Sequence, residues 1–239
     1  MDYFNNKVER HLRYKQEGLP DWLPKNGLIY YDTIPGYSRI AMTGQQYTEV
    51  TGSNDNPRPL DFQMIGGKRC LYKNSTNDNY LTFNIYDSPQ SVTDYTWGCW
   101  VYDTVGTCYN QQVFRLMDQD GLEYNYLSFS GTNSRLIVAH RSVNEDNASA
   151  YCYYNKGAIV GEWRFIYGWH GSGWFGPRMP PLEDGNNLGA AQDTRIAIAT
   201  ATLMPKGCFG AAIRGAFIYN RVITAAEGMA IYNGSKDEQ

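Results

Sequence analysis

The stretch IRGAFIYNRVITAAEGMAIYNG, from Ile213 to Gly234, joins a strand pattern to a helix pattern. Side chains of a strand alternate between its two faces, so the first half of the stretch divides into two sets. One face would carry Ile213, Phe217 and Tyr219, and the other Arg214, Ala216 and Ile218. This alternation predicts a strand over the first half.

The second half carries the signals of a short helix. Thr224 is a typical N-cap residue, and Glu227, three positions on, completes a capping box. Alanines between and after them favour a helix, and Asn233 with Gly234 is typical of a helix end. We therefore expect the last strand to complete a sheet, and the helix to cover one end of a sandwich.

From Gly27 onward, short segments rich in aromatic or β-branched residues are bounded by Gly, Asn, Asp or Pro, which is typical of strands. These segments are GLIYYDTI, RCLYKN, NYLTFNIY, TWGCWVYD, QQVFRLMD, LEYNYLSF, RLIVAHR, SAYCYYN and EWRFIYGWH. Two hairpin turns are predicted, DQDG at 118–121 and SGTNS at 130–134. Residues 171–187, with several prolines and glycines, predict a long exposed loop.

This spacing of strands, without intervening helices, predicts antiparallel sheets packed as a sandwich or closed as a barrel. We expect an all-β protein, a two-sheet antiparallel β-sandwich of jelly-roll type over residues 27–239, with a short C-terminal helix. Residues 1–26 form a separate segment, in which Phe4, Val8 and Leu12 recur every four positions. That period predicts a helical arm, which packs on its own domain or docks onto a partner.

The composition excludes several classes of protein. Of 239 residues, 42% are hydrophobic and 19% charged, as in folded proteins, and the net charge of −3 offers no basic field for nucleic acid. No stretch has the length of a membrane span. The segment MDYFNNKVERHLRYKQ has no unbroken apolar core and so differs from a secretory signal.

Five widely spaced cysteines lack the close pairs of zinc sites, and we interpret them as mostly reduced thiols of a protein made in a cytoplasm.

Several segments follow one another in the order found in the concanavalin A-like lectin/glucanase superfamily, in its laminin G-like branch. GLIYYDTI, LYKNSTNDNYLTF, YTWGCWVYD and GEWRFIYGWHGSG each resemble an element of that family, and the stretch from Ile213 to Gly234 resembles its closing strand and helix. The resemblance covers about residues 27–234. It implies a β-sandwich that recognises glycans through loops or a concave sheet, often with calcium at its rim.

The enzymes of this superfamily carry catalytic carboxylates as E-x-D-x-x-E on one strand, which places all three on one face. The chain contains no E-x-D, and no G-x-S-x-G for a nucleophilic serine. We therefore expect a protein without enzymatic activity. The alternative is a divergent glycoside hydrolase whose carboxylates converge from distant loops.

Binding of a glycan needs aromatic faces beside polar side chains. One candidate cluster is Trp169, His170, Trp174 and Phe175 in the segment WHGSGWF, unless these side chains fold back over the core. A second candidate is Tyr124 with Tyr126, which share one strand face as a sugar platform or as plain cross-strand packing. Asp118 and Asp120 offer oxygen ligands for calcium, or they simply provide the chemistry of a hairpin turn.

The displayed fold and the Tyr- and Asn-rich composition favour an adhesion module on a virion, such as a bacteriophage head or tail decoration protein. The alternatives are a free-standing lectin-like protein, extracellular or at a cell surface, and the hydrolase. The expected partners are a glycan or cell-surface polysaccharide, virion or capsid proteins held through residues 1–26, and further copies of the chain in a homo-oligomer. Neither nucleic acid nor a membrane is expected as a partner.

Overall fold

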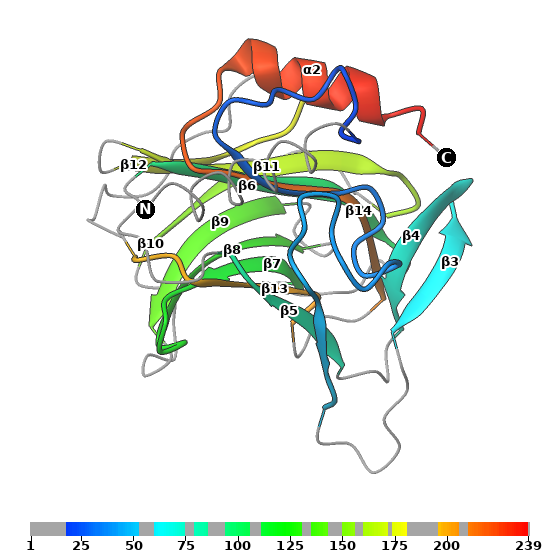
Figure 1. The fold of residues 1–239 in the computed structure, drawn as a ribbon, viewed down its shortest axis with the longest axis horizontal. Coiled ribbons are helices and arrows are strands. Elements are labelled where there is room, and N and C mark those ends of the chain that lie inside the picture. Colours follow the sequence, from blue (N-terminus) through cyan, green and yellow to red (C-terminus); the bar gives the residue numbers. More distant parts are fainter. Residues whose placement is uncertain are drawn as a thin grey trace, which may run out of the picture.

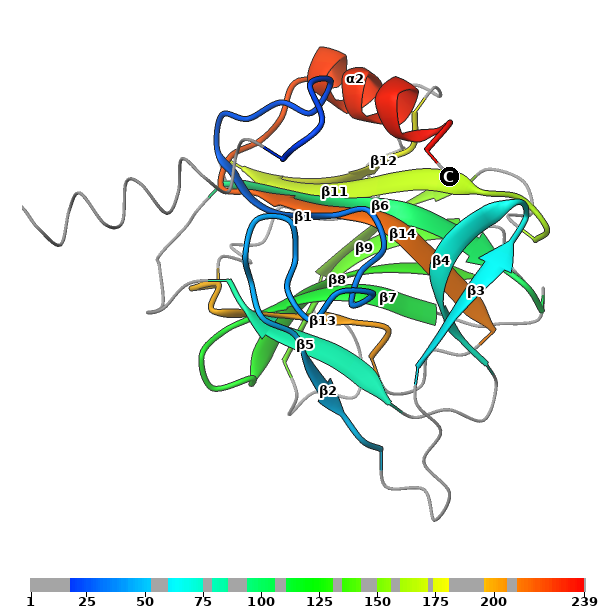
Figure 2. The same cartoon turned by 45° about the vertical axis from the view of Figure 1, so that its right-hand side comes forward.

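The described part of the protein is a sandwich of two antiparallel sheets with a C-terminal helix packed on the outside (Figures 1 and 2). We describe it from a computed structural model. The described residues are 18–52, 60–74, 79–85, 94–105, 111–130, 135–142, 150–155, 160–171, 174–180, 196–205 and 210–238. The predicted two-sheet β-sandwich with a short C-terminal helix is confirmed. In the described part of the chain, no helix is long and apolar enough to cross a bilayer.

The first sheet has the strand order β12-β11-β6-β14-β4-β3, and β1 also pairs with β14. Its strands are β1 (Leu28–Asp32), β3 (Asp61–Ile65), β4 (Lys68–Lys73), β6 (Tyr95–Asp103), β11 (Arg164–Gly171), β12 (Trp174–Arg178) and β14 (Ala211–Tyr219). Every residue of β14 is buried, because β6 lies on one side of it, β4 and β1 on the other, and both of its faces are covered.

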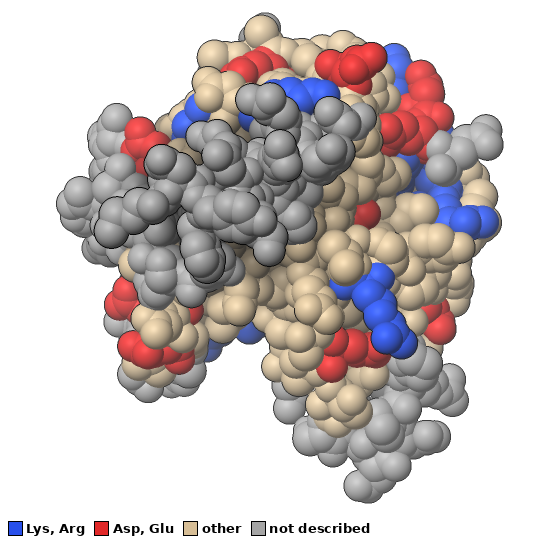
Figure 3. Space-filling model, viewed as in Figure 1, with Lys and Arg blue, Asp and Glu red and all other residues tan. Residues whose placement is uncertain are grey.

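The second sheet has the order β10-β9-β8-β7-β13-β5-β2. Its strands are β2 (Thr48–Val50), β5 (Tyr80–Asn84), β7 (Gln111–Met117), β8 (Glu123–Ser130), β9 (Arg135–Ser142), β10 (Ala150–Asn155) and β13 (Thr200–Leu203). This sheet arches beneath the first, so its outer face is concave (Figures 1 and 2). Figure 3 shows the molecular surface hollowed below it, between two projecting lobes. We call this outer side the concave face.

All nine strands predicted from short aromatic or β-branched segments are present. The predicted hairpins are also found, since β7 pairs with β8 and β8 with β9, although residues 131–134 of the second turn lie outside the described residues. The prediction of an exposed loop over 171–187 is wrong at its start. Residues 174–178 form β12, which pairs with β11, and Gly176 and Pro177 are buried. Residues 181–187 lie outside the described part.

The core between the sheets is aromatic and aliphatic, with Tyr30 stacked on Phe83 at 4.3 Å between ring centroids. A second cluster lies on the outer side of the first sheet, where Phe165 stacks on Phe217 at 5.8 Å. Strands β6, β11 and β14 of the first sheet are therefore buried on both faces, which is why they read as continuous apolar runs rather than as alternating ones.

A β-bulge in β14 changes which side chains share a face. The pairing of β14 with β6 shifts between Arg214 and Phe217, and Gly215 there has φ 56°. A positive φ favours glycine, and the Gly215 amide donates to the Thr33 carbonyl at 2.8 Å. The extra residue turns Ile213 toward the inner core, whereas Phe217 points outward. The predicted grouping of Ile213 with Phe217 on one face is therefore wrong.

Helix α2 (Ala225–Ser235) packs on the outer aromatic cluster and begins as predicted. Thr224 is the N-cap, and both hydrogen bonds of the capping box with Glu227 are present. The predicted helix end at Gly234 is wrong, because the helix continues to Ser235. Gly234 has a packing role instead. A Cβ atom at Gly234 would lie 2.2 Å from Cδ2 of Trp22, so only glycine allows this close approach.

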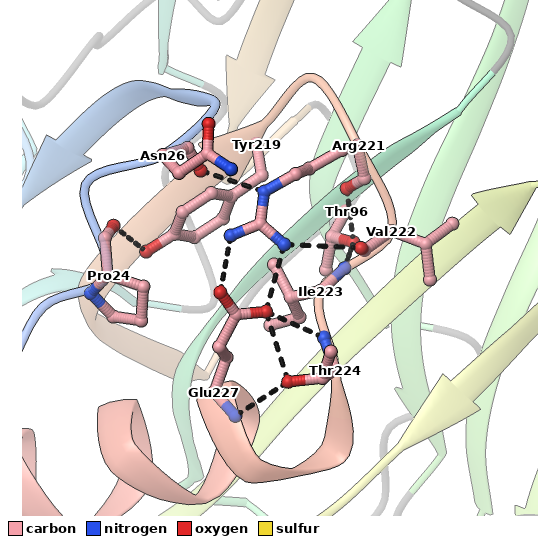
Figure 4. Close-up of polar contacts among 9 residues, drawn as sticks. All are labelled: Pro24, Asn26, Thr96, Tyr219, Arg221, Val222, Ile223, Thr224 and Glu227. Carbon is pink, nitrogen blue, oxygen red and sulfur yellow. Dashed lines mark hydrogen bonds and ion pairs between the residues drawn. The ribbon is translucent and has the colours of Figure 1, made fainter.

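Figure 4 shows how the start of α2 is fastened to the sheet. Both guanidinium Nη atoms of Arg221 donate to the Glu227 carboxylate, at 2.8 and 2.5 Å, and its Nε donates to the Asn26 carbonyl at 2.8 Å. The Tyr219 hydroxyl donates to the Pro24 carbonyl at 2.7 Å. These bonds tie the segment before β1 to the junction of β14 and α2. In the same segment, Leu19 and Leu23 are buried in the outer aromatic cluster. Residues 1–17 of the predicted arm lie outside the described residues.

Candidate functional site

The concave face carries its most distinctive side chains on β7, β8 and β9. Strand register aligns them in two rows, because residues paired across neighbouring strands lie side by side. From β13 to β9, the first row is Thr202, Arg115, Tyr126 and Ala139, and the second is Thr200, Met117, Tyr124 and Arg141. Two arginines therefore flank two tyrosines from opposite sides. We call Arg115, Tyr124, Tyr126 and Arg141 the tyrosine–arginine patch.

The tyrosine rings are packed rather than displayed. Tyr124 is 5% exposed and Tyr126 7%, and their ring centroids lie 5.8 Å apart. Both rings contact a small apolar cluster formed with Ala139, Met117 and Ile137. The predicted common face of the two tyrosines is present, but these rings offer little bare surface for a sugar to stack on.

Arg115 lies over one of these rings. Its Cζ atom is 4.6 Å from the centroid of Tyr124, and its Nε donates to Oε1 of Gln112 at 2.5 Å. These contacts fix the direction of the guanidinium group, because a cation is attracted to the face of an aromatic ring. Both Arg115 and Arg141 are half-buried, so each keeps a solvent-accessible part.

Burial raises the pKa of the Tyr126 hydroxyl, and Arg141 and Arg115 both act on that pKa in the opposite direction. Both positive charges therefore lie close enough to the Tyr126 hydroxyl to act electrostatically on its pKa. Ser128 lies two residues further along β8 on the same face. It is fully buried, and its Oγ atom has no hydrogen-bond partner.

The described residues place no carboxylate on the concave face. The strands of the second sheet contain only two acidic residues, Glu49 and Glu123. Glu49 lies opposite Leu81, whose side chain faces the core, and its Oε1 accepts hydrogen bonds from Leu60 N and Asn79 Nδ2. Glu123 directly precedes Tyr124 in β8, so its position is on the opposite face of the sheet from Tyr124. A pair of carboxylates for glycoside hydrolysis is therefore absent from the described part of this face.

The predicted aromatic cluster in WHGSGWF is divided between two strands. Trp169 and His170 lie in β11, and Trp174 and Phe175 in β12. Trp169 is half-buried against the outer aromatic cluster of the first sheet. His170 points the other way and is fully buried. The side chains of Trp174 and Phe175 lie outside the description. His170 therefore lies in the interior of the protein and not in an exposed loop, as the sequence had predicted.

A polar chain runs through the interior behind the tyrosine–arginine patch. The His170 ring stacks on Tyr95 at 5.1 Å and an interplanar angle of 8°. Asn125 donates from Nδ2 to the Tyr95 hydroxyl, and its Oδ1 lies 2.9 Å from Nδ1 of His140. These contacts join β11 and β6 of the first sheet to β8 and β9 of the second. Because they bridge the two sheets, they hold β8 and β9 in place beneath the first sheet.

Asp118 and Asp120 lie in the turn between β7 and β8. Asp118 Oδ1 accepts the amide of Leu122 at 2.9 Å, and the Asp118 amide donates to the Glu123 carbonyl at 3.0 Å. This is the chemistry of a hairpin turn. Within the described ranges, no three His, Cys, Asp or Glu side chains come together as a metal site. A calcium ion at Asp118 and Asp120 would therefore need ligands from elsewhere.

No protein-family model matches the sequence, and no curated protein matches it. Solved structures match the fold. The receptor-binding domain of botulinum neurotoxin D is 10% identical with a TM-score of 0.65, over 87% of this chain and 52% of that one. A botulinum neurotoxin type C structure gives 10% identity and a TM-score of 0.62, over 87% and 51%. The present chain thus spans about half the length of these structures.

A mutant sialidase of Trypanosoma rangeli that displays trans-sialidase activity also matches, at 8% identity and a TM-score of 0.59, over 97% of this chain and 39% of that one. At such identities the likeness concerns the fold alone. It agrees with a two-sheet β-sandwich of the kind that these larger proteins contain.

Proposed function

We propose that this protein is a non-catalytic recognition module of the concanavalin A-like, laminin G-like type, which binds glycans of a cell surface on its concave face. The observation that carries the proposal is the tyrosine–arginine patch, set on the concave face, where the described residues place no carboxylate. Two guanidinium groups, of which that of Arg115 has a fixed direction, and several hydroxyl-bearing neighbours suit a ligand rich in oxygen atoms.

The structural neighbours support recognition over catalysis. One is a receptor-binding domain, and the neurotoxin of type C depends on two ganglioside molecules for cell entry. The sialidase neighbour is an enzyme, but the chain covers only 39% of it. Hydrolysis through paired carboxylates would require acidic side chains from outside the described concave face.

Binding can be tested with a glycan array and the full chain, followed by titration of the best ligand. Ile137→Asp would place a charged, hydrated group on the concave face, and Phe62→Asp is the matched control on the edge strand of the first sheet, where Phe62 is 40% exposed. We expect Ile137→Asp to abolish binding and Phe62→Asp to retain it. The bound glycan should be recovered intact.

If the folded protein binds no glycan on the array, this proposal is overturned. Equal loss of binding in Ile137→Asp and Phe62→Asp would also overturn it. Release of reducing ends from the bound glycan would replace it with the hydrolase alternative. Repeating the titration with and without calcium tests whether Asp118 and Asp120 contribute to a metal site.

We further propose display on a virion, made in a host cytoplasm, as the setting for this recognition. The support is the composition and the fold, and the docking segment would lie in residues 1–26. Purified particles probed with an antibody against the sandwich, before and after removal of residues 1–17, would test this setting. Retention of the shortened protein on the particles would contradict docking through those residues.

A further inference from the structure

The charge on the concave face is opposite in sign to that of the whole protein. The chain has a net charge of −3. On the described strands of the second sheet, however, the charged residues at positions that share the face of Tyr124 and Tyr126 are all arginines, namely Arg115, Arg141 and, by register, Arg135. A ligand approaching this face would therefore meet local positive charge, and attraction at short range would favour an anion.

The tyrosines do not provide a free stacking surface. Tyr124 has Arg115 over its ring at 4.6 Å, and both rings are more than nine-tenths buried. On this face the Tyr124 ring supports the guanidinium group of Arg115. Recognition here would consequently depend on charge-assisted hydrogen bonds more than on contact between a sugar ring and an aromatic face.

Resting on the proposed function, we infer that the glycan bound by the concave face is an anionic saccharide, whose carboxylate or sulfate groups pair with Arg115 and Arg141. Arginine presents a planar fork of donors that matches both kinds of anion. The arginines lie two strands and two residues apart, which corresponds to about 12 Å between their Cα atoms. This separation suits two acidic groups of one oligosaccharide.

The buried hydroxyl of Ser128 supports a polar ligand at this face. Its Oγ atom is buried and has no hydrogen-bond partner. Ser128 follows Tyr126 by two residues on the same strand face, and it lies opposite Gln112, which in turn contacts Arg115. A buried hydroxyl is rarely left unpaired, so a ligand group or an ordered water is expected to complete it.

The test uses four probes with the full chain: oligogalacturonate, its fully methyl-esterified form, heparin oligosaccharides and neutral dextran oligosaccharides. Esterification removes the carboxylate charge and keeps the sugar chain, while heparin adds sulfate. We expect oligogalacturonate or heparin to bind at least about tenfold more tightly than the neutral probes. The affinity should also fall as sodium chloride rises from about 50 to about 300 mM.

The double variant Arg115→Gln/Arg141→Gln should lower affinity for the anionic probes at least about tenfold per arginine removed. Arg69→Gln/Arg164→Gln is the matched control, because it removes the same charge from the first sheet. We expect this control to bind as the wild type does. Thermal unfolding of all variants establishes that each is folded.

Three outcomes would overturn the inference. Equal binding of oligogalacturonate and its methyl ester, together with weak heparin binding, would leave glycan recognition standing but exclude an anionic ligand. Equal losses in the patch variant and the control would show a general charge effect instead of a site. Absence of binding to every probe and to the glycan array would remove the proposed function as well.

Discussion

The two outer faces of the sandwich differ in what covers them. The outer face of the first sheet is closed by α2 and by residues before β1, and its aromatic side chains are interlocked, with Trp100 stacked on Tyr232 at 5.4 Å. The concave face of the second sheet carries arginines and threonines, and its described apolar cluster contains only three buried residues. Helix α2 and the residues before β1 thus turn the outer face of the first sheet into a second core.

The two outer faces of one architecture therefore differ in how their side chains can act. Side chains on the outer face of the first sheet exclude water and stabilise the fold through burial of their apolar surface. Those on the concave face, Arg115 and Arg141 among them, keep polar and charged groups within reach of solvent. Changes on the two faces should therefore have different consequences.

The greatest loss of stability is expected from a change on the outer face of the first sheet. Phe217 is fully buried, so Phe217→Ala should lower the free energy of unfolding by about 3–5 kcal/mol. Ile137→Ala on the concave face should cost only about 1 kcal/mol, because Ile137 is partly exposed. Urea unfolding monitored by tryptophan fluorescence measures both. Equal losses would mean that the concave face is packed as tightly as the closed one.

An intermediate effect is expected where α2 is fastened. Hydrogen bonding to Arg221 is the main cause that lowers the pKa of Glu227 from 4.5 to about 2. The ionised side chain therefore stabilises the fold above pH 4.5, and this contribution is lost as the pH falls toward 2. Glu227→Gln should cost about 1 kcal/mol at pH 7, since the pair is partly exposed.

The difference in stability between wild type and Glu227→Gln should shrink as the pH is lowered. Urea unfolding at several pH values between neutrality and the acid limb measures it. A difference that stays constant across this range would show that the ion pair with Arg221 does not stabilise α2, and that the variant acts through the cap alone.

The smallest effect on stability is expected in the tyrosine–arginine patch. Arg115→Gln removes a cation from the face of Tyr124, an interaction worth about 0.5–1 kcal/mol at partly exposed sites. Thermal unfolding should therefore change little. A loss as large as that of Phe217→Ala would assign Arg115 to the support of the sheet and weaken the contrast between the two faces.

Features set by neighbouring residues could be predicted from the sequence. The cap at Thr224 and Glu227 is one example, because the four residues 224–227 contain all of its chemistry. Most of the strands were also predictable, whereas β2, β3, β12 and β13 were missed. The bulge at Gly215 could not be predicted, since it depends on the carbonyl of Thr33, which is distant in sequence.

The candidate site was only half predicted. Tyr124 and Tyr126 share a face because they alternate along one strand, which the sequence shows directly. Arg115 was missed, although counting back from the DQDG turn pairs it with Tyr126. The interior position of His170 required knowledge of Tyr95 as its stacking partner, and nothing near His170 in the sequence indicates it.

The position of β14 has a consequence for folding during synthesis. Strands β7 to β10 follow one another along the chain and pair in that order, so they can form hairpins as soon as they emerge. The first sheet cannot close in this way. Its central strand is the last to be made, and the Tyr219 hydroxyl bonds to a carbonyl 195 residues earlier. Until Ala211–Tyr219 leaves the ribosome, β1, β4 and β6 lack their common neighbour, and their aromatic side chains stay open to chaperones or to aggregation.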